Sequence, residues 1–187
     1  MDGFIEGPNG ELDWAMAEDE DTWRDLFEML ESVDICILGR VMYPNYEQYW
    51  MAVLANPAGP LPLSGKLATE NGIKYAEWAN KTPHLVVSKT LDKVAWKTSR
   101  IVRGIEEIGK LKQQAGKNMY VVGGATLVGS LMNTGLIDEV QLMVCPLVLG
   151  GGKALFKDVK NRQGLKLERV NPLKSGKVSL TYNTSFT

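Results

Sequence analysis

The most constraining feature of this 187-residue chain is the stretch Met119–Met132, which reads MYVVGGATLVGSLM. A short apolar run, Tyr120–Val122, meets the glycine pair Gly123-Gly124, and apolar residues at helical spacing follow. This order predicts a strand, a turn without side chains and the first turn of a helix. Backbone N–H groups and the positive end of the helix dipole then meet at one place, which favours a phosphate. Because two glycines more often form only a tight corner, phosphate binding needs support from elsewhere in the chain.

Strand-like and helix-like segments alternate through the first three-quarters of the chain. Apolar runs predict buried strands at Asp34–Leu38 and His84–Val87, in addition to Tyr120–Val122, and a weaker β-like pattern covers Lys93–Val102. The segments with helical spacing are Trp23–Val33, Val41–Ala55, Leu67–Ala79 and Ile105–Leu111. The residues before them, through Trp14, are rich in glycine, proline and acids and are predicted to form a loop.

After Gly135 the pattern is typical of antiparallel strands. Val140–Leu149 is a long apolar run that contains Pro146, which indicates an edge position or a bulge. Leu165–Val170 and Lys177–Phe186 alternate apolar and polar residues and predict a hairpin. We therefore expect an α/β fold in a single domain over residues 1–187, with a mixed central sheet, helices on both faces and a C-terminal antiparallel hairpin.

The three apolar strands should end at one edge of the sheet, because strands linked through helices lie parallel. At that edge the sequence places Gly39-Arg40, Ser88-Lys89 and Gly123-Gly124. A single cation at a strand end is usually a solvated charge. Two cations and a bare glycine turn at one edge instead favour a phosphorylated dinucleotide, with the glycines at the pyrophosphate and Arg40 and Lys89 at a 2′-phosphate.

The ordered set of motifs also resembles a known family. Its parts are GR after one strand, SK after the next and VVGGATL opening a helix, with the opening DGFIEGPNGELDW and the later IDEV and PLVLGGGKALF. Together they resemble the dihydrofolate-reductase-like superfamily, most closely the reductase domain of bacterial riboflavin biosynthesis and its stand-alone relatives. The resemblance covers almost the whole chain. It implies a three-layer αβα fold, NADPH bound across the strand ends and a homodimer.

Carried over by position, the resemblance implies specific contacts. Ser88 and Lys89 would lie at the adenosine 2′-phosphate, Gly39 and Arg40 would contact the cofactor's phosphates, and the pyrophosphate would lie against Gly123, Gly124, Ala125, Thr126 and Leu127. The nicotinamide would lie near the opening loop, where Phe4 and Trp14 are the expected substrate contacts. Asp13 is the expected catalytic acid, since an acid beside an aromatic ring can protonate or orient a heterocycle; capping a turn is an equally common role for such a residue.

The implied activity is NADPH-dependent hydride transfer to a small heterocycle of the pyrimidine or pterin type, as in 5-amino-6-(5-phosphoribosylamino)uracil reductases. Dihydrofolate reductases proper place a carboxylate on the first helix, facing the pterin. At about 100° per residue, Asp25, Glu28 and Glu31 project away from the apolar face of the predicted first helix, so we expect solvated acids and no folate reduction. The alternative function is a non-catalytic nucleotide- or flavin-binding module, because no proton donor stands out.

The sequence departs from the family pattern in two places. Met42 stands where the family has a threonine near a phosphate, so one expected contact is missing. The family also has an apolar strand directly before the Asp-Gly of the opening loop, whereas Met1 stands there in this chain. We expect that this strand was lost through truncation or start-codon misassignment, and pairing with a segment of another chain is the alternative. Gly150–Gly152 is a candidate second phosphate nest, although a strand-exit loop is its commoner use.

Composition excludes several other classes. A formal net charge of −1 gives no reason to expect nucleic acid or a membrane surface as partner. No apolar run approaches the roughly 20 residues of a membrane span, and no signal peptide is recognisable, so we expect a cytoplasmic protein. The two cysteines, Cys36 and Cys145, lie in apolar runs, and His84 is the only histidine. We therefore expect neither a disulfide nor a metal site.

Overall fold

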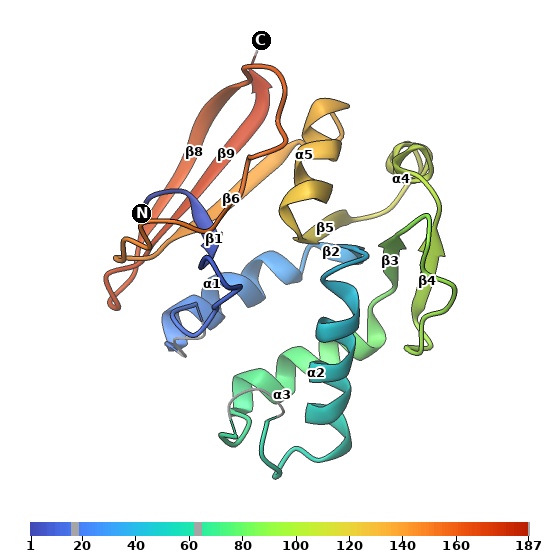
Figure 1. The fold of residues 1–187 in the computed structure, drawn as a ribbon, viewed down its shortest axis with the longest axis vertical. Coiled ribbons are helices and arrows are strands. Elements are labelled where there is room, and N and C mark those ends of the chain that lie inside the picture. Colours follow the sequence, from blue (N-terminus) through green and yellow to red (C-terminus); the bar gives the residue numbers. More distant parts are fainter. Residues whose placement is uncertain (16–18, 62–64, 187) are drawn as a thin grey trace. The chain divides into compact units, whose positions relative to one another are not determined.

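The computed structural model describes residues 1–15, 19–61 and 65–186, and the chain divides into two compact units. Unit 1 comprises Met1–Leu30 and Ala125–Thr187, and unit 2 comprises Glu31–Gly124 (Figure 1). The elements of unit 2 are β2 (Val33–Gly39), α2 (Tyr43–Ala55), α3 (Glu70–Lys81), β3 (His84–Val87), β4 (Ser99–Val102), α4 (Ile105–Lys112) and β5 (Asn118–Gly123). Those of unit 1 are β1 (Phe4–Glu6), α1 (Glu20–Leu30), α5 (Ala125–Asn133), β6 (Glu139–Val144), β7 (Lys153–Ala154), β8 (Gly164–Pro172) and β9 (Val178–Phe186).

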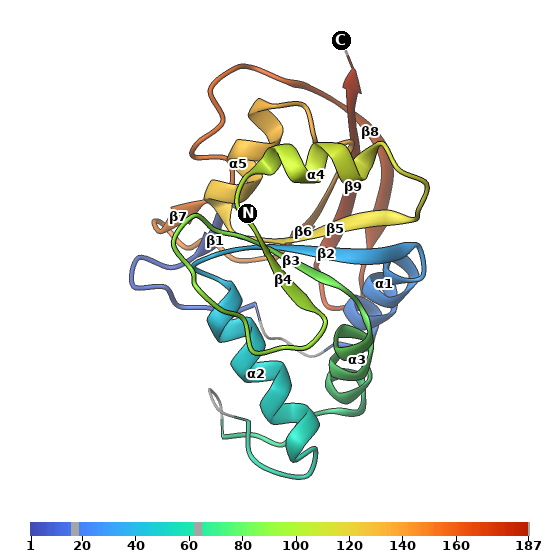
Figure 2. The same ribbon diagram turned by 90° about the vertical axis from the view of Figure 1, so that its right-hand side faces the viewer.

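Unit 2 is built on a parallel sheet with the strand order β4-β3-β2-β5. The central strands β2 and β3 carry its most buried residues, with Cys36, Leu38 and Val86 each 0% exposed. Helix α4 lies on one side of this sheet, and α2 and α3 lie on the other (Figure 2). The predicted parallel strands and the helices on both faces are therefore confirmed for this sheet.

Side-chain hydrogen bonds set two element boundaries that the sequence pattern placed differently. Strand β4 is shorter than the predicted Lys93–Val102, because Trp96 is held in the preceding turn. Its Nε1 donates to Asn80 Oδ1 at 2.8 Å, and its backbone N–H donates to the Glu47 carboxylate at 2.8 Å. Helix α3 begins at Glu70, later than predicted, because Thr69 is its N-cap and accepts a hydrogen bond from the backbone N–H of Gly72.

A buried polar chain lies within unit 2. His84 Nδ1 lies 2.7 Å from the carbonyl oxygen of Thr82, so Nδ1 carries the proton and Nε2 accepts from the Tyr46 hydroxyl at 3.3 Å. The Tyr46 and Tyr75 hydroxyls are 3.1 Å apart, and the His84 ring stacks on Trp96. His84 is 0% exposed, and burial lowers its pKa from the ordinary 6.5 to about 4. The neutral imidazole is thus part of the core.

We expect this histidine to make unit 2 less stable in mild acid. The folded-state pKa lies below the unfolded value, so the contribution of neutral His84 is complete above pH 6.5 and is lost as the pH falls toward 4. The loss between pH 7 and pH 5 should be about 2 kcal/mol. Urea unfolding at both pH values measures it, and a His84→Phe variant should lack this difference. An equal pH dependence in the variant would contradict the assignment.

Unit 1 contains an antiparallel sheet with the order β6-β9-β8, in which β8 and β9 form the predicted C-terminal hairpin. Strand β6 ends at Val144, not at Leu149 as predicted, and Pro146, which lacks an N–H, lies two residues further on. The loop prediction is wrong at Phe4–Glu6, where β1 pairs with β7. Strands of two and three residues are too short to show periodicity, and their partners lie far apart in the sequence.

Helix α1 corrects the prediction for Asp25, which is 3% exposed and not solvated. Its carboxylate accepts hydrogen bonds from Gln141 Nε2 and Asn171 Nδ2, both at 3.0 Å, and lies 3.5 Å from the Arg169 guanidinium. Periodicity counted apolar residues only, whereas the polar face of the β6-β9-β8 sheet decides which side of α1 is covered. Glu28 and Glu31 are exposed, as predicted.

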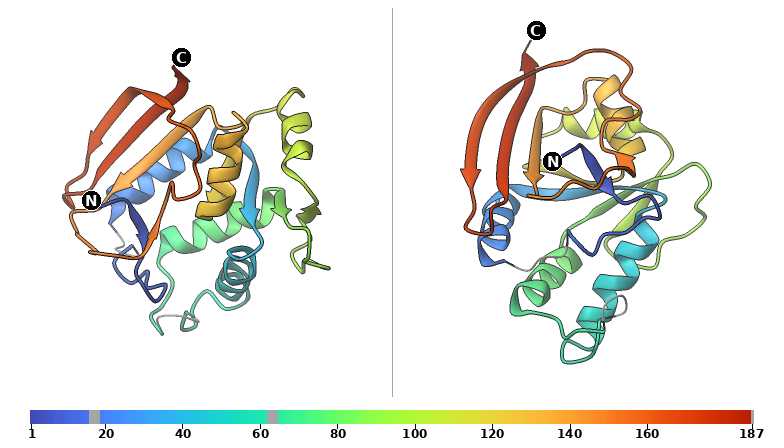
Figure 3. Two further views of the ribbon diagram at one scale, coloured as in Figure 1. Left: turned by 45° about the horizontal axis from the view of Figure 1, so that its top comes forward. Right: turned by 60° about the vertical axis from the view of Figure 1, so that its left-hand side comes forward.

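The N-terminal end of α1 is fixed in the same polar way. Asp19 accepts a hydrogen bond from the backbone N–H of Thr22 at 2.7 Å and an ion-paired one from Lys177 Nζ at 2.7 Å. Burial opposes ionisation of Asp19, but these hydrogen bonds prevail and hold its pKa below the ordinary value. Lys177 begins the return of the hairpin and is 5% exposed. Within unit 1, ion pairs and hydrogen bonds therefore connect α1 to the hairpin (Figure 3).

The α/β fold class is confirmed, and the strands are hydrogen-bonded in three separate sheets. Among the described residues, β5 pairs only with β2, and β6 pairs only with β9. The single domain and the missing first strand stay predictions. No helix in the described parts of the chain is both long and apolar enough to cross a membrane.

Candidate functional site

The ends of the four parallel strands meet at one edge of unit 2. Gly39 is paired with Val87, Leu38 with Gly123, and Val87 with Val102. The residues that follow are Arg40 after β2, Ser88-Lys89 after β3, Arg103 after β4 and Gly124 after β5. The predicted convergence of three strand ends is confirmed, and β4 supplies a fourth.

Arg103 is the residue at this edge that the sequence pattern missed. Its guanidinium NH1 donates to the carbonyl oxygens of Ser88 at 3.2 Å and Leu91 at 2.8 Å, so it fixes the loop after β3. The signal was present, since IVRG places a cation after a strand as ILGR does at Arg40. Arg40, Lys89 and Arg103 are all exposed, which makes the edge attractive to an anion.

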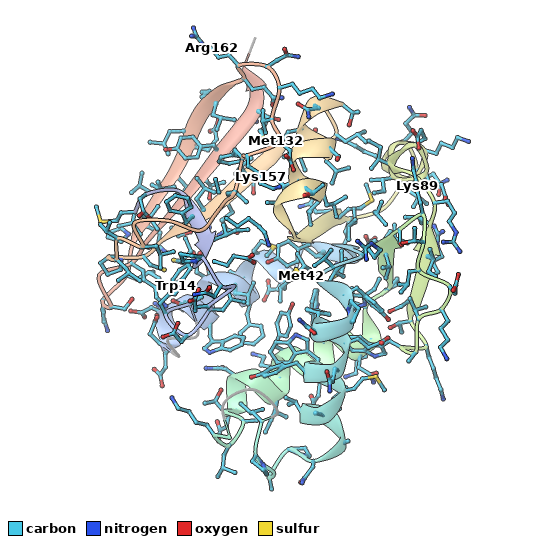
Figure 4. All side chains as sticks on the ribbon, in the orientation of Figure 1. Trp14, Met42, Lys89, Met132, Lys157 and Arg162 are labelled. Carbon is cyan, nitrogen blue, oxygen red and sulfur yellow. The ribbon has the colours of Figure 1, made fainter. Side chains whose placement is uncertain are left out.

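Ser88 and Lys89 have different parts in this edge. Ser88 is 5% exposed, and its Oγ accepts from the backbone N–H groups of Leu91 at 2.8 Å and Thr90 at 3.2 Å. Ser88 therefore shapes the turn after β3, with only its hydroxyl proton left to donate. The adjacent Lys89 is exposed at the outer side of unit 2 (Figure 4).

The glycine pair leaves bare backbone at the same edge. A cis peptide bond joins Gly123 to Gly124. Gly123 has φ +142°, and a Cβ there would lie 3.2 Å from Met42 Sδ, so a side chain at this position would crowd Met42. A Cβ on Gly124 would meet nothing within 4 Å. The backbone of Gly124 thus faces open space in which a ligand could approach it, while Met42 offers no hydroxyl.

The residues after the glycine pair are the first turn of α5. Ala125 and Leu127 are 2% and 7% exposed, so only their backbone N–H groups are suited to a ligand. Thr126 is exposed and adds a hydroxyl. The first N–H groups of a helix have no intrahelical acceptor, which suits an anion.

The predicted substrate residues belong to unit 1, whereas the strand ends belong to unit 2. Phe4 lies on β1, paired with Ala154. Trp14 Nε1 donates to the Glu11 carbonyl at 3.3 Å (Figure 4). Asp13 is exposed and, among the described residues, has no hydrogen bond or ion pair that would orient it. The roles of Phe4, Asp13 and Trp14 stay predictions.

The second glycine-rich loop, Gly150–Gly152, already contributes to binding a carboxylate of the protein itself. The Asp2 carboxylate accepts from the backbone N–H groups of Gly150 at 2.8 Å and Leu149 at 2.9 Å. The hydrogen bond from Gly150 is the main reason that the pKa of Asp2 is lowered. Gly150–Gly152 is therefore a structural nest for Asp2 and does not serve as an independent phosphate site. No group of three or more metal-ligating side chains occurs within residues 1–15, 19–61 and 65–186.

Known proteins are similar to this chain over most of its length. The model of the RibD C-terminal domain family matches residues 1–179. The uncharacterised protein YyaP of Bacillus subtilis is 34% identical over 184 residues, which cover 98% of this chain and 89% of YyaP. A second protein of that organism, the uncharacterised YwjB, is 26% identical over 169 residues, or 90% of this chain and 84% of YwjB.

Solved structures show the same fold. A putative riboflavin biosynthesis protein of Shewanella sp. PV-4 matches with a TM-score of 0.69 and 20% identity over 98% of this chain and 93% of the other. Dihydrofolate reductase of Enterococcus faecalis matches with a TM-score of 0.56 and 14% identity over 96% and 88%. A bifunctional deaminase and 5-amino-6-(5-phosphoribosylamino)uracil reductase of Thermotoga maritima matches with a TM-score of 0.58 and 15% identity over 97% of this chain and 53% of that one.

These similarities show that the fold is dihydrofolate-reductase-like. The chain belongs to the RibD C-terminal domain family.

Proposed function

We propose that this protein is an NADPH-dependent reductase that transfers hydride to a small heterocyclic substrate of the pyrimidine or pterin type. The observation that carries the proposal is the convergence of Arg40, Lys89, Arg103 and Gly124 at the ends of four adjacent parallel strands. In open α/β sheets this edge is the usual place for a nucleotide. The structurally similar Enterococcus faecalis dihydrofolate reductase was solved in complex with NADP(H), which supports the choice of cofactor.

At this edge, cationic side chains and bare backbone N–H groups would bind different phosphates of the cofactor. Lys89, within the loop after β3, and Arg103, which fixes that loop, would hold the 2′-phosphate, and Arg40 would hold a further phosphate oxygen. Gly124 and the first turn of α5 would offer backbone N–H groups to the pyrophosphate. When bound, NADPH supplies the hydride, and the protein binds and orients the reactants and excludes water.

Binding of NADPH and NADH, followed by the quenching of the fluorescence of the five tryptophans, tests the proposal. We expect NADPH to bind at least 10-fold more tightly than NADH, because a charge-assisted hydrogen bond to phosphate contributes about 1.5–3 kcal/mol. Equal affinities would refute the 2′-phosphate site. Turnover is then followed as loss of reduced nicotinamide with 5-amino-6-(5-phosphoribosylamino)uracil and with dihydrofolate.

The second candidate function is a nucleotide- or flavin-binding module without turnover, which the exposed and unoriented Asp13 favours. Tight NADPH binding without oxidation by any heterocycle would select this candidate.

Two variants and a control distinguish a loss of cofactor binding from a loss of folding. Lys89→Gln should weaken NADPH about 10-fold and leave NADH unchanged, whereas Lys110→Gln, which removes an exposed cation of α4, should change neither. Gly124→Ala should weaken both dinucleotides by a similar factor, because its Cβ fills the open space but meets no protein atom within 4 Å. Circular dichroism confirms that each variant is folded. Unchanged affinity in Gly124→Ala would remove the pyrophosphate from this position.

A further inference from the structure

Helix α5 is short and contains a glycine at its centre. It has only nine residues, Ala125–Asn133, and helices of this length are marginally stable without tertiary contacts. Gly129 lowers its intrinsic helix propensity further. The direction in which its first turn points therefore depends on the segments that pack against the helix. One of these segments in unit 1 is the β7–β8 connection, residues 155–163 (Figure 3).

Gly129 allows the β7–β8 connection to approach the helix closely. A Cβ at Gly129 would lie 2.9 Å from Cβ of Asp158 and 3.2 Å from its carbonyl carbon. These distances are shorter than normal van der Waals contact, so a side chain at Gly129 would displace either Asp158 or the helix. The glycine that weakens α5 as an isolated helix thus permits the contact that holds the helix in the folded protein.

Side-chain hydrogen bonds attach the last turn of α5 to the same connection. Asn133 Nδ2 donates to the carbonyl oxygen of Asp158 at 2.9 Å, and Asn133 Oδ1 accepts from the backbone N–H of Lys160 at 2.9 Å. Gln163 Nε2 donates to the carbonyl oxygen of Met132 at 3.0 Å. Because both polar atoms of the Asn133 amide bond to the backbone of the connection, this side chain fixes the helix along its axis and in its rotation about that axis.

We propose that Asn133 is a positioning residue for the cofactor, which holds α5 so that the first turn of the helix directs its N–H groups at the pyrophosphate. This role rests on the proposed function, in which Gly124 and that turn bind the pyrophosphate. A helix advances about 1.5 Å per residue, so Asn133 acts on Thr126 from about 10 Å away through a stiff element. The cations that would hold the 2′-phosphate belong to unit 2. Loss of the Asn133 contacts should therefore weaken binding of the pyrophosphate and leave binding of the 2′-phosphate unchanged.

The test is calorimetric titration of the full chain with NADPH, NADH and adenosine 2′-monophosphate, which has the 2′-phosphate but no pyrophosphate. Asn133→Ala should weaken NADPH and NADH by a similar factor, about 10-fold, and leave adenosine 2′-monophosphate unchanged. Gly129→Ala should act in the same direction, although alanine favours the helix itself. Lys89→Gln should have the complementary effect and weaken NADPH and adenosine 2′-monophosphate but not NADH. Arg162→Gln is the matched control, since Arg162 is an exposed residue of the same connection, and it should change none of the affinities (Figure 4).

A measurement on the wild type is independent of folding defects in the variants. Coupling between two sites is reciprocal, so a pyrophosphate at the first turn of α5 should slow amide hydrogen exchange in residues 155–163. NADPH should give this protection, and adenosine 2′-monophosphate should not. Unchanged dinucleotide affinity in both Asn133→Ala and Gly129→Ala would overturn the positioning role alone. So would an equal loss of affinity for all three ligands, or exchange in residues 155–163 that NADPH leaves unchanged. A wild type that binds neither dinucleotide would refute the proposed function as well.

Discussion

Replacement of Asp25 by alanine is expected to lower the free energy of unfolding by about 2–4 kcal/mol, a large share of the net stability of a folded protein. The carboxylate is 3% exposed and is the acceptor for Gln141 and Asn171, with Arg169 at 3.5 Å. Removal leaves the amide donors of Gln141 and Asn171 without their acceptor, whereas the guanidinium of Arg169, whose side chain is 47% exposed, can turn to water. Denaturant unfolding followed by far-ultraviolet circular dichroism measures the loss.

Glu28→Ala is the matched control for Asp25, because Glu28 lies on the same helix and is exposed. It should change stability by less than about 0.5 kcal/mol. The loss of stability in Asp25→Asn should fall between those of Asp25→Ala and Glu28→Ala. The amide keeps one acceptor oxygen, but its NH₂ group faces the donors of neighbouring side chains. Equal stability of the Asp25 and Glu28 variants would show that the buried hydrogen bonds contribute little. A folded Asp25→Ala protein that still binds NADPH would also exclude a role for this carboxylate at the cofactor.

Gly152→Ala is expected to be the most destabilising glycine-to-alanine change in unit 1. It should lower the free energy of unfolding by more than about 4 kcal/mol. Gly152 has φ +132°, and a Cβ would lie 2.0 Å from the carbonyl oxygen of Glu6. Neither atom can move aside alone, because Glu6 is paired with Lys153 through backbone and side chain. The β1–β7 pair would therefore have to separate.

Alanine variants of the two neighbouring glycines distinguish the effect of the steric clash from the effect of the positive φ. Gly150 has φ +73° but open space, so Gly150→Ala should cost only the roughly 1–2 kcal/mol of a left-handed alanine. Gly151 has no such φ, and a Cβ would lie 3.7 Å from Pro8, so Gly151→Ala should be nearly neutral. Thermal unfolding of the three variants should rank them in this order. A Gly152 variant as stable as Gly150→Ala would place the strain in φ alone.

Much of the candidate site could be predicted because it depends on local patterns. A strand, a crossover and a further strand lie parallel whatever the details of packing, so the residues after β2, β3 and β5 had to meet at one edge. Arg103 was missed because β4 is only four residues long and Trp96 extends its apparent pattern toward Lys93. Phe4 was assigned to a loop because its partner, Ala154, is too far along the chain for any local pattern to indicate.

The sequence by itself determined the α/β class, the parallel strands, the C-terminal hairpin and the cationic, glycine-lined edge, since each follows from periodicity, turn residues and chain connectivity over a few dozen residues. Only the tertiary structure decided that Asp25 is buried, that Asp2 fills the glycine nest at Gly150 and that the antiparallel sheet is covered on its polar face. These features depend on pairs of residues more than 100 positions apart. Their free energy comes from desolvated hydrogen bonds, and a pattern of apolar residues contains no information on where the partners of a polar group will lie.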